Sequence, residues 1–177
     1  MSKLTAYDKF MQQALKYGFS VYGTAKTGQT ISYHAYDDGY YQKGFPIKGD
    51  RFVDNGDGTI SDRGTGLMWP KDGNGEGCFY GATRNWAEAL DRAHDRVLGG
   101  YNDWRLPNVK EMYTIIDISR LAPAVFPIFI NVKNDVHWTS NTPSWEPTWG
   151  IQIGTLLGSL EGNLKTSYAY LWPCRNQ

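Results

Sequence analysis

The side chains that could carry out chemistry are few in this chain of 177 residues, and no spacing joins them into a catalytic site. Three histidines and several serines are present, but no Gly-x-Ser-x-Gly motif places a nucleophilic serine on a sharp strand-to-helix turn. Asp37 and Asp38 form a carboxylate pair in a stretch typical of a solvated turn. We therefore expect a protein that is not an enzyme.

An acidic cluster around an Asn-Gly-Asp-Gly sequence suggests a metal site, because calcium prefers carboxylate oxygens. Its members are Asp54, Asp57 and Asp62. An EF-hand loop needs oxygen ligands at its first, third and fifth positions before a glycine, and the spacing here differs. Aspartates in tight turns also accept hydrogen bonds from their own backbone without any metal. We expect no cofactor, and calcium at the three aspartates is the alternative.

Cys78 and Cys174 are the only cysteines of the chain. They could form one long-range disulfide, which would stabilise the fold by roughly 3–5 kcal/mol in the loop-entropy model. They could equally remain two ordinary thiols. The sequence has no Cys-x-x-Cys pair and no histidine with zinc spacing, which argues against a structural zinc site.

Charge and hydropathy exclude several classes of partner. Eighteen basic and eighteen acidic residues cancel, so we expect no nucleic-acid partner. No apolar run is long enough to span a membrane, so we expect no membrane insertion. The first ten residues carry charges where a signal peptide needs an apolar stretch. Either the protein is not exported by that route, or a signal is missing from this sequence.

The elements that would position these side chains fall into two parts. We assign residues 1–48 to an N-terminal helix and an extended aromatic arm, and residues 49–177 to a folded domain. The helix is expected over residues 1–18, and one strand of the arm at Thr30–Tyr33. A helix this short needs a surface to dock on, and its own domain and a neighbouring copy are both open alternatives. Its apolar stripe comprises Leu4, Tyr7, Phe10, Met11, Ala14 and Leu15.

A ten-residue stretch, Gly99–Asn108, organises the folded domain because it separates the two expected helices. Its glycines end the first helix, residues 83–98, since glycine readily takes the left-handed conformation at a helix C-terminus. Asn108 begins the second helix, residues 109–119, and Glu111 completes a capping box with it.

Most of the remaining domain predicts antiparallel β-structure. A hairpin is expected over residues 51–69. The last third contains candidate strands at residues 136–140, 148–154, 156–160 and 168–172, with turns at 154–158 and 161–163. Twenty glycines and an aromatic share of 15% fit a loop-rich α+β domain better than a helical bundle. Core positions are expected at Trp104, Leu106, Val125, Phe126, Phe129 and Trp138.

Several separated motifs, in order, resemble the bacterial DUF1566 domain, the C-terminal domain of the Legionella collagen-like adhesin. They are RFVDNGDGTISD at residues 51–62, TGLMW at 65–69, WAEAL at 86–90, GGYNDWRLPN at 99–108, WTS at 138–140 and YLWPCR at 170–175. With the lead-in stretches that begin at Thr27 and Asp37, the resemblance covers about residues 27–177. It is specific, because the motifs are distinct and keep their order.

The resemblance implies a C-type-lectin-like fold with two helices, a small mixed or antiparallel sheet, and long loops closed by paired terminal strands. The fold is shared with formylglycine-generating oxidases, so the fold alone does not decide function. Those oxidases need a pair of close cysteines for copper, and no such pair is evident here. Many family members carry a cysteine near the end of the first helix, where this chain has Ala93 and His94. The pairing of Cys78 with Cys174 therefore stays a hypothesis.

The resemblance also indicates where a ligand would bind, because loops between the late strands of C-type-lectin-like folds usually carry the contacts. Here the candidate ligand-binding residues are Ser140, Asn141, Trp145, Glu146 and Trp149. Aromatic rings beside amides and carboxylates suit the recognition of sugars or proteins. We expect Trp145, which lies among prolines, to be exposed. Glu146-Pro147 is similar to a sugar–calcium motif of lectins, but Thr148 stands where that motif has Asn.

Two functions follow from these observations. The first is a non-catalytic binding module for adhesion, with a glycan or protein receptor as partner, located outside the cell, on its surface or on a virion. The alternative is an assembly subunit of a surface filament or phage virion. In that case residues 1–48 would dock on a neighbouring copy.

Overall fold

The structure, a computed structural model, describes residues 27, 29–43 and 51–177. The helix expected over residues 1–18 lies outside the described residues. In the described part of the arm, α2 (Asp38–Tyr41) forms one turn, and the Asp37 side chain accepts a hydrogen bond from the Tyr40 N–H. The strand expected at Thr30–Tyr33 is wrong, because Asp37 also binds the backbone N–H of Tyr33 and holds this stretch in a turn.

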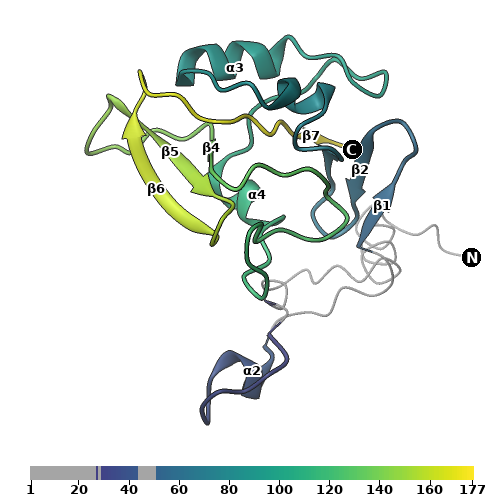
Figure 1. Cartoon of the computed structure of the whole chain (residues 1–177), viewed down its shortest axis with the longest axis vertical. Coiled ribbons are helices and arrows are strands. Elements are labelled where there is room, and N and C mark those ends of the chain that lie inside the picture. Colours follow the sequence, from purple (N-terminus) through teal and green to yellow (C-terminus); the bar gives the residue numbers. More distant parts are fainter. Residues whose placement is uncertain (1–26, 28, 44–50) are drawn as a thin grey trace, which may run out of the picture.

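The folded domain contains two antiparallel sheets and few helices. The first sheet has the order β1-β2-β3-β7, with β1 (Phe52–Asp54), β2 (Thr59–Asp62), β3 (Leu67–Pro70) and β7 (Arg175–Asn176). This confirms the hairpin predicted over residues 51–69. Because β7 pairs with β3, the end of the chain returns beside the start of the domain. In Figure 1 this sheet lies on the right, the second sheet on the left, and α4 between them.

The second sheet has the order β4-β5-β6, with β4 (Val136–Trp138), β5 (Trp149–Gly154) and β6 (Ser159–Leu164). The predicted turn at residues 161–163 is wrong, because this stretch is the middle of β6. The chain reverses earlier, where the Gly158 N–H donates to the Gly154 carbonyl at 2.8 Å. Residues 168–172 make only isolated bridges, Arg84 with Ala169 and His137 with Tyr170, instead of the predicted strand.

Both helices of the domain are shorter than predicted. α3 (Trp86–His94) begins after Asn85, whose side chain accepts a hydrogen bond from the Glu88 N–H. It ends before the two glycines, which have positive φ angles of 61° and 82° and turn the chain between Leu98 and Tyr101. α4 (Val109–Tyr113) carries the predicted capping box but makes only one turn, because Ile116 then pairs with Val125.

Buried side chains form two clusters, and tryptophans lie in both. One cluster lies between the first sheet and α4, around Ile60, Trp69, Met112 and Trp172. The other lies beneath α3, around Ala89, Leu106 and Trp138. The predicted core positions are confirmed, with Phe126 partly buried at the edge of the first cluster. Among the described residues, no helix is long and apolar enough to cross a membrane.

The two cysteines are free, buried thiols in the structure, which is the second of the two alternatives. Cys78 lies in a kinked 3₁₀ segment, Glu76–Gly81, and both sulfurs belong to the first core cluster. Burial raises the pKa of Cys78 and raises the pKa of Cys174 to about 12. A thiolate, not a thiol, is the reactive form.

We therefore expect neither thiol to react with Ellman's reagent while the chain is folded. Both should react at once after denaturation in urea without a reductant. The measurement is the release of thionitrobenzoate from native and denatured protein. If denatured, unreduced protein released none, the disulfide alternative would hold instead.

Candidate functional site

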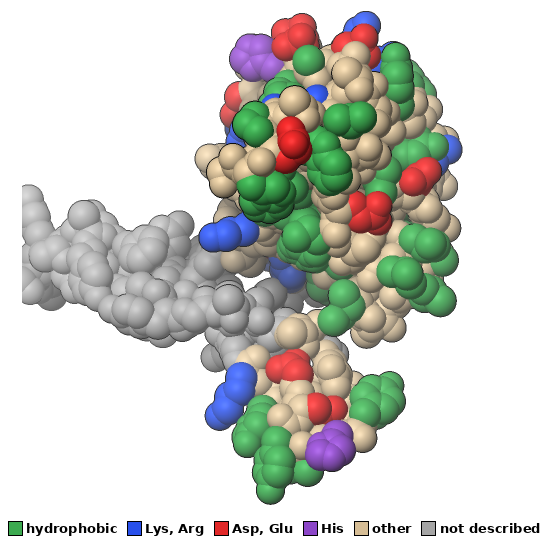
Figure 2. Space-filling model, turned by 90° about the vertical axis from the view of Figure 1, so that its left-hand side faces the viewer, with side chains coloured by type: hydrophobic (Ala, Val, Ile, Leu, Met, Phe, Trp, Pro, Cys, Tyr) green, Lys and Arg blue, Asp and Glu red, His purple; other side chains and the backbone are tan. Residues whose placement is uncertain are grey.

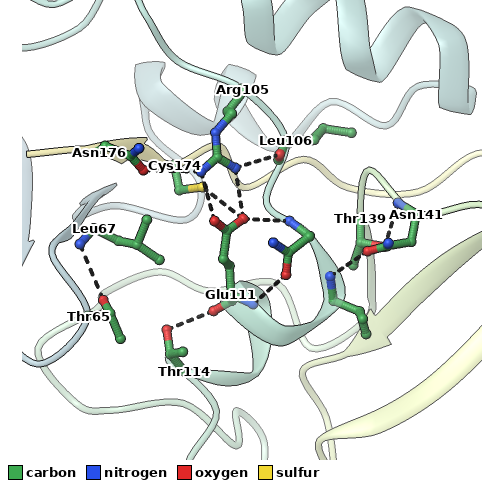
Figure 3. A network of polar contacts seen from close by, with 12 residues as sticks. Thr65, Leu67, Arg105, Leu106, Glu111, Thr114, Thr139, Asn141, Cys174 and Asn176 are labelled. Atoms are coloured by element: carbon green, nitrogen blue, oxygen red, sulfur yellow. Dashed lines mark hydrogen bonds and ion pairs between the residues drawn. The ribbon is translucent and has the colours of Figure 1, made fainter. Parts of the chain in front are cut away.

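A bidentate ion pair between Arg105 and Glu111 forms the centre of the candidate site (Figure 3). The two terminal guanidinium nitrogens each donate to one carboxylate oxygen of Glu111 at 2.8 Å. Glu111 also accepts from the Asn108 N–H at 2.8 Å, and its own N–H donates to the Asn108 side chain at 2.9 Å. Burial opposes ionisation of Glu111, but Arg105 and the Asn108 N–H outweigh it and lower the pKa of the carboxyl group.

Backbone contacts with distant parts of the chain hold this pair in place. Arg105 exchanges two backbone hydrogen bonds with Cys174, at 2.9 and 2.8 Å. The Ser140 N–H donates to the Pro107 carbonyl at 2.8 Å, and the Val109 N–H donates to the Asn141 side chain at 2.7 Å. The stretch before α4 is thus fixed by the C-terminal segment on one side and by the segment after β4 on the other. A site built on it is rigid before any ligand arrives.

A hollow of about 620 Å³ lies between α3 and this ion pair. It is lined by Leu90, Asp91, His94, Asp95, Arg105, Leu106, Asn108, Glu111 and Ser140. A second hollow, of about 530 Å³, lies beyond Glu111 and shares Asn108 and Glu111 with the first. Asn108 and Glu111 therefore form the wall between two depressions of the surface, and Arg105 faces the first of them.

The first hollow has more negative than positive charge. Asp91, His94 and Asp95 occupy positions i, i+3 and i+4 near the end of α3, so their side chains share one face of the helix. With Glu111 they give three carboxylates against the single guanidinium of Arg105. These groups can accept hydrogen bonds from hydroxyl or ammonium groups. In the described part of the chain, no group of three or more His, Cys, Asp or Glu side chains is placed to hold a metal ion.

Residues 58–175 match the family model described as the Lcl C-terminal domain. The chain belongs to the Lcl C-terminal domain family. The match runs from the hairpin turn before β2 into β7 and so includes every residue that lines the first hollow. It confirms the predicted family. No curated protein matches the chain.

The structure of this Lcl C-terminal domain gives the five predicted ligand-binding residues different surroundings. Ser140 is exposed and lines the first hollow. The Asn141 side chain accepts a hydrogen bond from the Val109 N–H at the start of α4. Trp145 is 80% exposed, as predicted. The Glu146 carboxylate accepts from the Thr148 N–H at 3.3 Å, within its own turn. Trp149 begins β5, and its ring packs against Gly162 of β6.

The three aspartates of the calcium alternative also have separate partners. The Lys71 ammonium pairs with Asp54 at 2.5 Å and lowers the pKa of that carboxyl group. Asp57 accepts from the N–H and the hydroxyl of Thr59, at 3.0 and 2.6 Å. Asp62 pairs with Arg51. Each carboxylate therefore stabilises a turn or an ion pair of the first sheet.

Sequence reasoning missed the acidic face of α3 as part of a site. Helical periodicity places Asp91, His94 and Asp95 on a polar face, but periodicity does not say what lies opposite that face. The capping box marked Glu111, yet its pairing with Arg105 had no separate signal. The closeness of Arg105 to α3 depends on the turn at residues 98–101, which sends the chain back beneath the helix.

Proposed function

We propose that this Lcl C-terminal domain is a non-catalytic recognition domain of a surface-associated adhesin, with a C-type-lectin-like fold. Its ligand is an uncharged or amino-bearing sugar unit of a glycan, bound in the hollow between α3 and the Arg105–Glu111 pair. The observation that carries the proposal is this hollow, about 620 Å³ in volume and lined by carboxylates, an amide and a hydroxyl. Membership of the Lcl C-terminal domain family supports the adhesive role.

The charges of the hollow support this class of ligand. Sugar hydroxyls donate hydrogen bonds, and Asp91 and Asp95 are exposed carboxylates that accept them. Leu90, which is partly buried, offers apolar surface for the carbon-bound face of a sugar ring. A sulfated or carboxylated sugar would instead meet an excess of like charge. Among these sugars, one with an ammonium group gains the most binding free energy, because its charge is opposite to that of the carboxylates.

The arrangement of Ser140 and His94 supports binding over catalysis. Both line the hollow beside two aspartates. Serine, histidine and aspartate are the residue types of a hydrolase triad. Within the described residues, however, no hydrogen bond joins Ser140 to His94 or His94 to a carboxylate. The side chains of Asp91, His94 and Asp95 are all exposed, so water is not excluded from them. The alternative, acyl hydrolysis, requires those contacts to form with substrate.

The test compares glycan binding by the wild type and by two sets of variants. We expect Asp91→Asn with Asp95→Asn to weaken binding of an amino-sugar ligand about tenfold or more, because two charge-assisted hydrogen bonds are lost. Glu76→Gln, at an exposed carboxylate outside the hollow, should leave affinity unchanged. The measurement is isothermal titration with a ligand first selected on an array of neutral, amino and sulfated glycans.

The other outcomes each change the proposal. If Trp145→Ala abolishes binding while the aspartate variant binds normally, the ligand site is the loop before β5. If only sulfated glycans bind, the proposed ligand class is wrong. Ester or glycoside hydrolysis that is lost in His94→Ala would show an enzyme.

A further inference from the structure

The second hollow, which lies beyond Glu111, differs in chemical character from the first. Its volume is about 530 Å³. Its polar lining comprises Thr65, Asn108, Lys110, Glu111, Thr114 and Asn176. Figure 3 shows two of these residues, Thr65 and Asn176, to the left of Glu111. The hydrogen bonds that these groups already make decide which ligand group fits the hollow.

Two amide side chains of this lining keep their NH2 groups free for a ligand. The Asn108 side-chain oxygen accepts from the Glu111 N–H at 2.9 Å, and the Asn176 side-chain oxygen accepts from Arg105 at 3.2 Å. Each contact uses the oxygen of the amide, so the nitrogen is the atom left over. Within the described residues, neither NH2 group donates a hydrogen bond and the Lys110 ammonium forms no ion pair. The second hollow therefore offers N–H donors from three side chains.

The one carboxylate of this lining is already compensated. Both oxygens of Glu111 accept from Arg105 at 2.8 Å, and one of them also accepts from the Asn108 N–H at 2.8 Å. In the described part of the chain, Lys110 is then the charge of the second hollow without an opposite charge beside it. The first hollow has the opposite excess, because it contains the acidic face of α3. Figure 2 shows acidic side chains beside a histidine at the upper end of the domain, where α3 lies.

Contacts with the first sheet fix the two threonines of this lining. The Thr65 hydroxyl donates to the buried Asp62 carboxylate at 2.8 Å. Arg51 donates to the Thr114 carbonyl at 2.8 Å. Because Arg51 and Asp62 form an ion pair with each other, they join the two threonines into one network. A hollow with fixed walls needs little reorganisation when a ligand enters, which favours binding.

We propose that the second hollow binds a carboxylate, carried by the sugar unit next to the one in the first hollow. A carboxylate has two oxygens and accepts charge-assisted hydrogen bonds, which matches an ammonium group beside two amide NH2 groups. The wall between the hollows consists of Asn108 and Glu111, so two joined sugar units can occupy both hollows. This assignment rests on the proposed function, since it requires a sugar in the first hollow. The ligand is then a glycan in which a hydroxyl- or ammonium-bearing unit adjoins an acidic unit.

Two ligands that differ only in the carboxyl group test the assignment. One is a disaccharide of glucosamine and galacturonic acid, and the other is the same disaccharide with its carboxyl group reduced to the alcohol. We expect the wild type to bind the acid about fivefold more tightly than the alcohol, because the acid gains one exposed ion pair with Lys110. Isothermal titration at pH 7 measures both dissociation constants.

Lys110→Gln removes the charge and keeps a side chain of similar length. This variant should bind both disaccharides equally, with the affinity that the wild type has for the alcohol. Lys43→Gln, at an exposed lysine outside both hollows, is the matched control and should keep the preference for the acid. Circular dichroism checks that both variants fold.

Three results would overturn the carboxylate site and leave the proposed function in place. Equal binding of the acid and the alcohol by the wild type would mean that the second hollow binds no carboxylate. A preference for the acid that persists in Lys110→Gln would place the carboxylate elsewhere. Tighter binding of a sulfated analogue than of the acid would mean that the bound anion is a sulfate.

Two further results concern the proposed function. If the variant that carries both Asp91→Asn and Asp95→Asn bound the acid normally while Lys110→Gln did not, the second hollow would be the ligand site and the proposed role of the first would be wrong. If the wild type bound neither disaccharide, the proposed function and the carboxylate site would both be wrong.

Discussion

Replacing Asp62 with alanine is expected to lower the free energy of unfolding by about 3–5 kcal/mol, because it leaves a buried guanidinium without its carboxylate. The side chain of Asp62 is 0% exposed and that of Arg51 is 14% exposed. Arg51 donates to both carboxylate oxygens, at 2.8 and 2.7 Å. The Gly64 N–H and the Thr65 hydroxyl donate to the same carboxylate, at 2.9 and 2.8 Å.

The control is Asp54→Ala, at a carboxylate that is exposed and pairs with Lys71 on the surface. It should change stability little, since surface ion pairs contribute little. Urea denaturation at pH 7, with and without calcium, measures both variants. If calcium stabilised the wild type and not these variants, the aspartates would be ligands of the ion. If Asp54→Ala lowered the free energy of unfolding as much as Asp62→Ala, burial of Asp62 would not be the reason for its effect.

The sequence predicted the parts of the fold that depend on local signals. The Asn108–Glu111 capping box, the hairpin turn before β2 and the exposure of Trp145 each depend on residues close together in the chain. A cap requires only a side chain that reaches an N–H three residues away. Such contacts form in the same way whatever the rest of the chain does.

The errors arose where a distant segment decided the local structure. Residues 114–119 have helical spacing, but α4 stops at Tyr113 because the Asp117 N–H donates to Ala124 across the following loop. Gly158 and Gly162 are equal turn signals in sequence. Pairing of Gly162 with Ile151 of β5 keeps the second glycine extended, so only the first turns the chain.

The candidate site depended on distant contacts for most of its residues. Arg105, Asp91 and Ser140 come from three separate segments, and no short-range pattern links them. Of the lining residues, the capping box had marked Asn108 and Glu111, and the resemblance to a family had marked Ser140. The hollow between them depends on the packing of α3 over Leu106. Tertiary structure alone provides that information.

Replacing Glu111 with alanine is expected to lower the free energy of unfolding by about 2–3 kcal/mol, since it removes both an ion pair and half of a capping box. The loss is smaller than for Asp62 because solvent reaches this pair, with side-chain exposures of 40% for Arg105 and 20% for Glu111. Thermal unfolding and urea titration at pH 7 provide the measurement. Glu76→Ala, at an exposed carboxylate 3.3 Å from Arg96, is the control and should cost less than about 1 kcal/mol.

The pH dependence separates the charge of Glu111 from its packing. Its pKa is lower in the folded chain than the usual value near 4.5, so the ionised carboxylate favours the folded state. This contribution is fully present above pH 4.5 and is lost as the pH falls through the folded pKa. We therefore expect the stability difference between wild type and Glu111→Ala to be constant near neutral pH and to shrink in acid.

A second buried group titrates in acid and must be subtracted. Burial lowers the pKa of His137 from 6.5 to about 4, so stability from the neutral imidazole is present above pH 6.5 and declines towards pH 4. His137 is present in both wild type and Glu111→Ala, so its effect cancels in the difference between them. If that difference did not shrink below pH 4.5, the ion pair with Arg105 would not be the source of the stability.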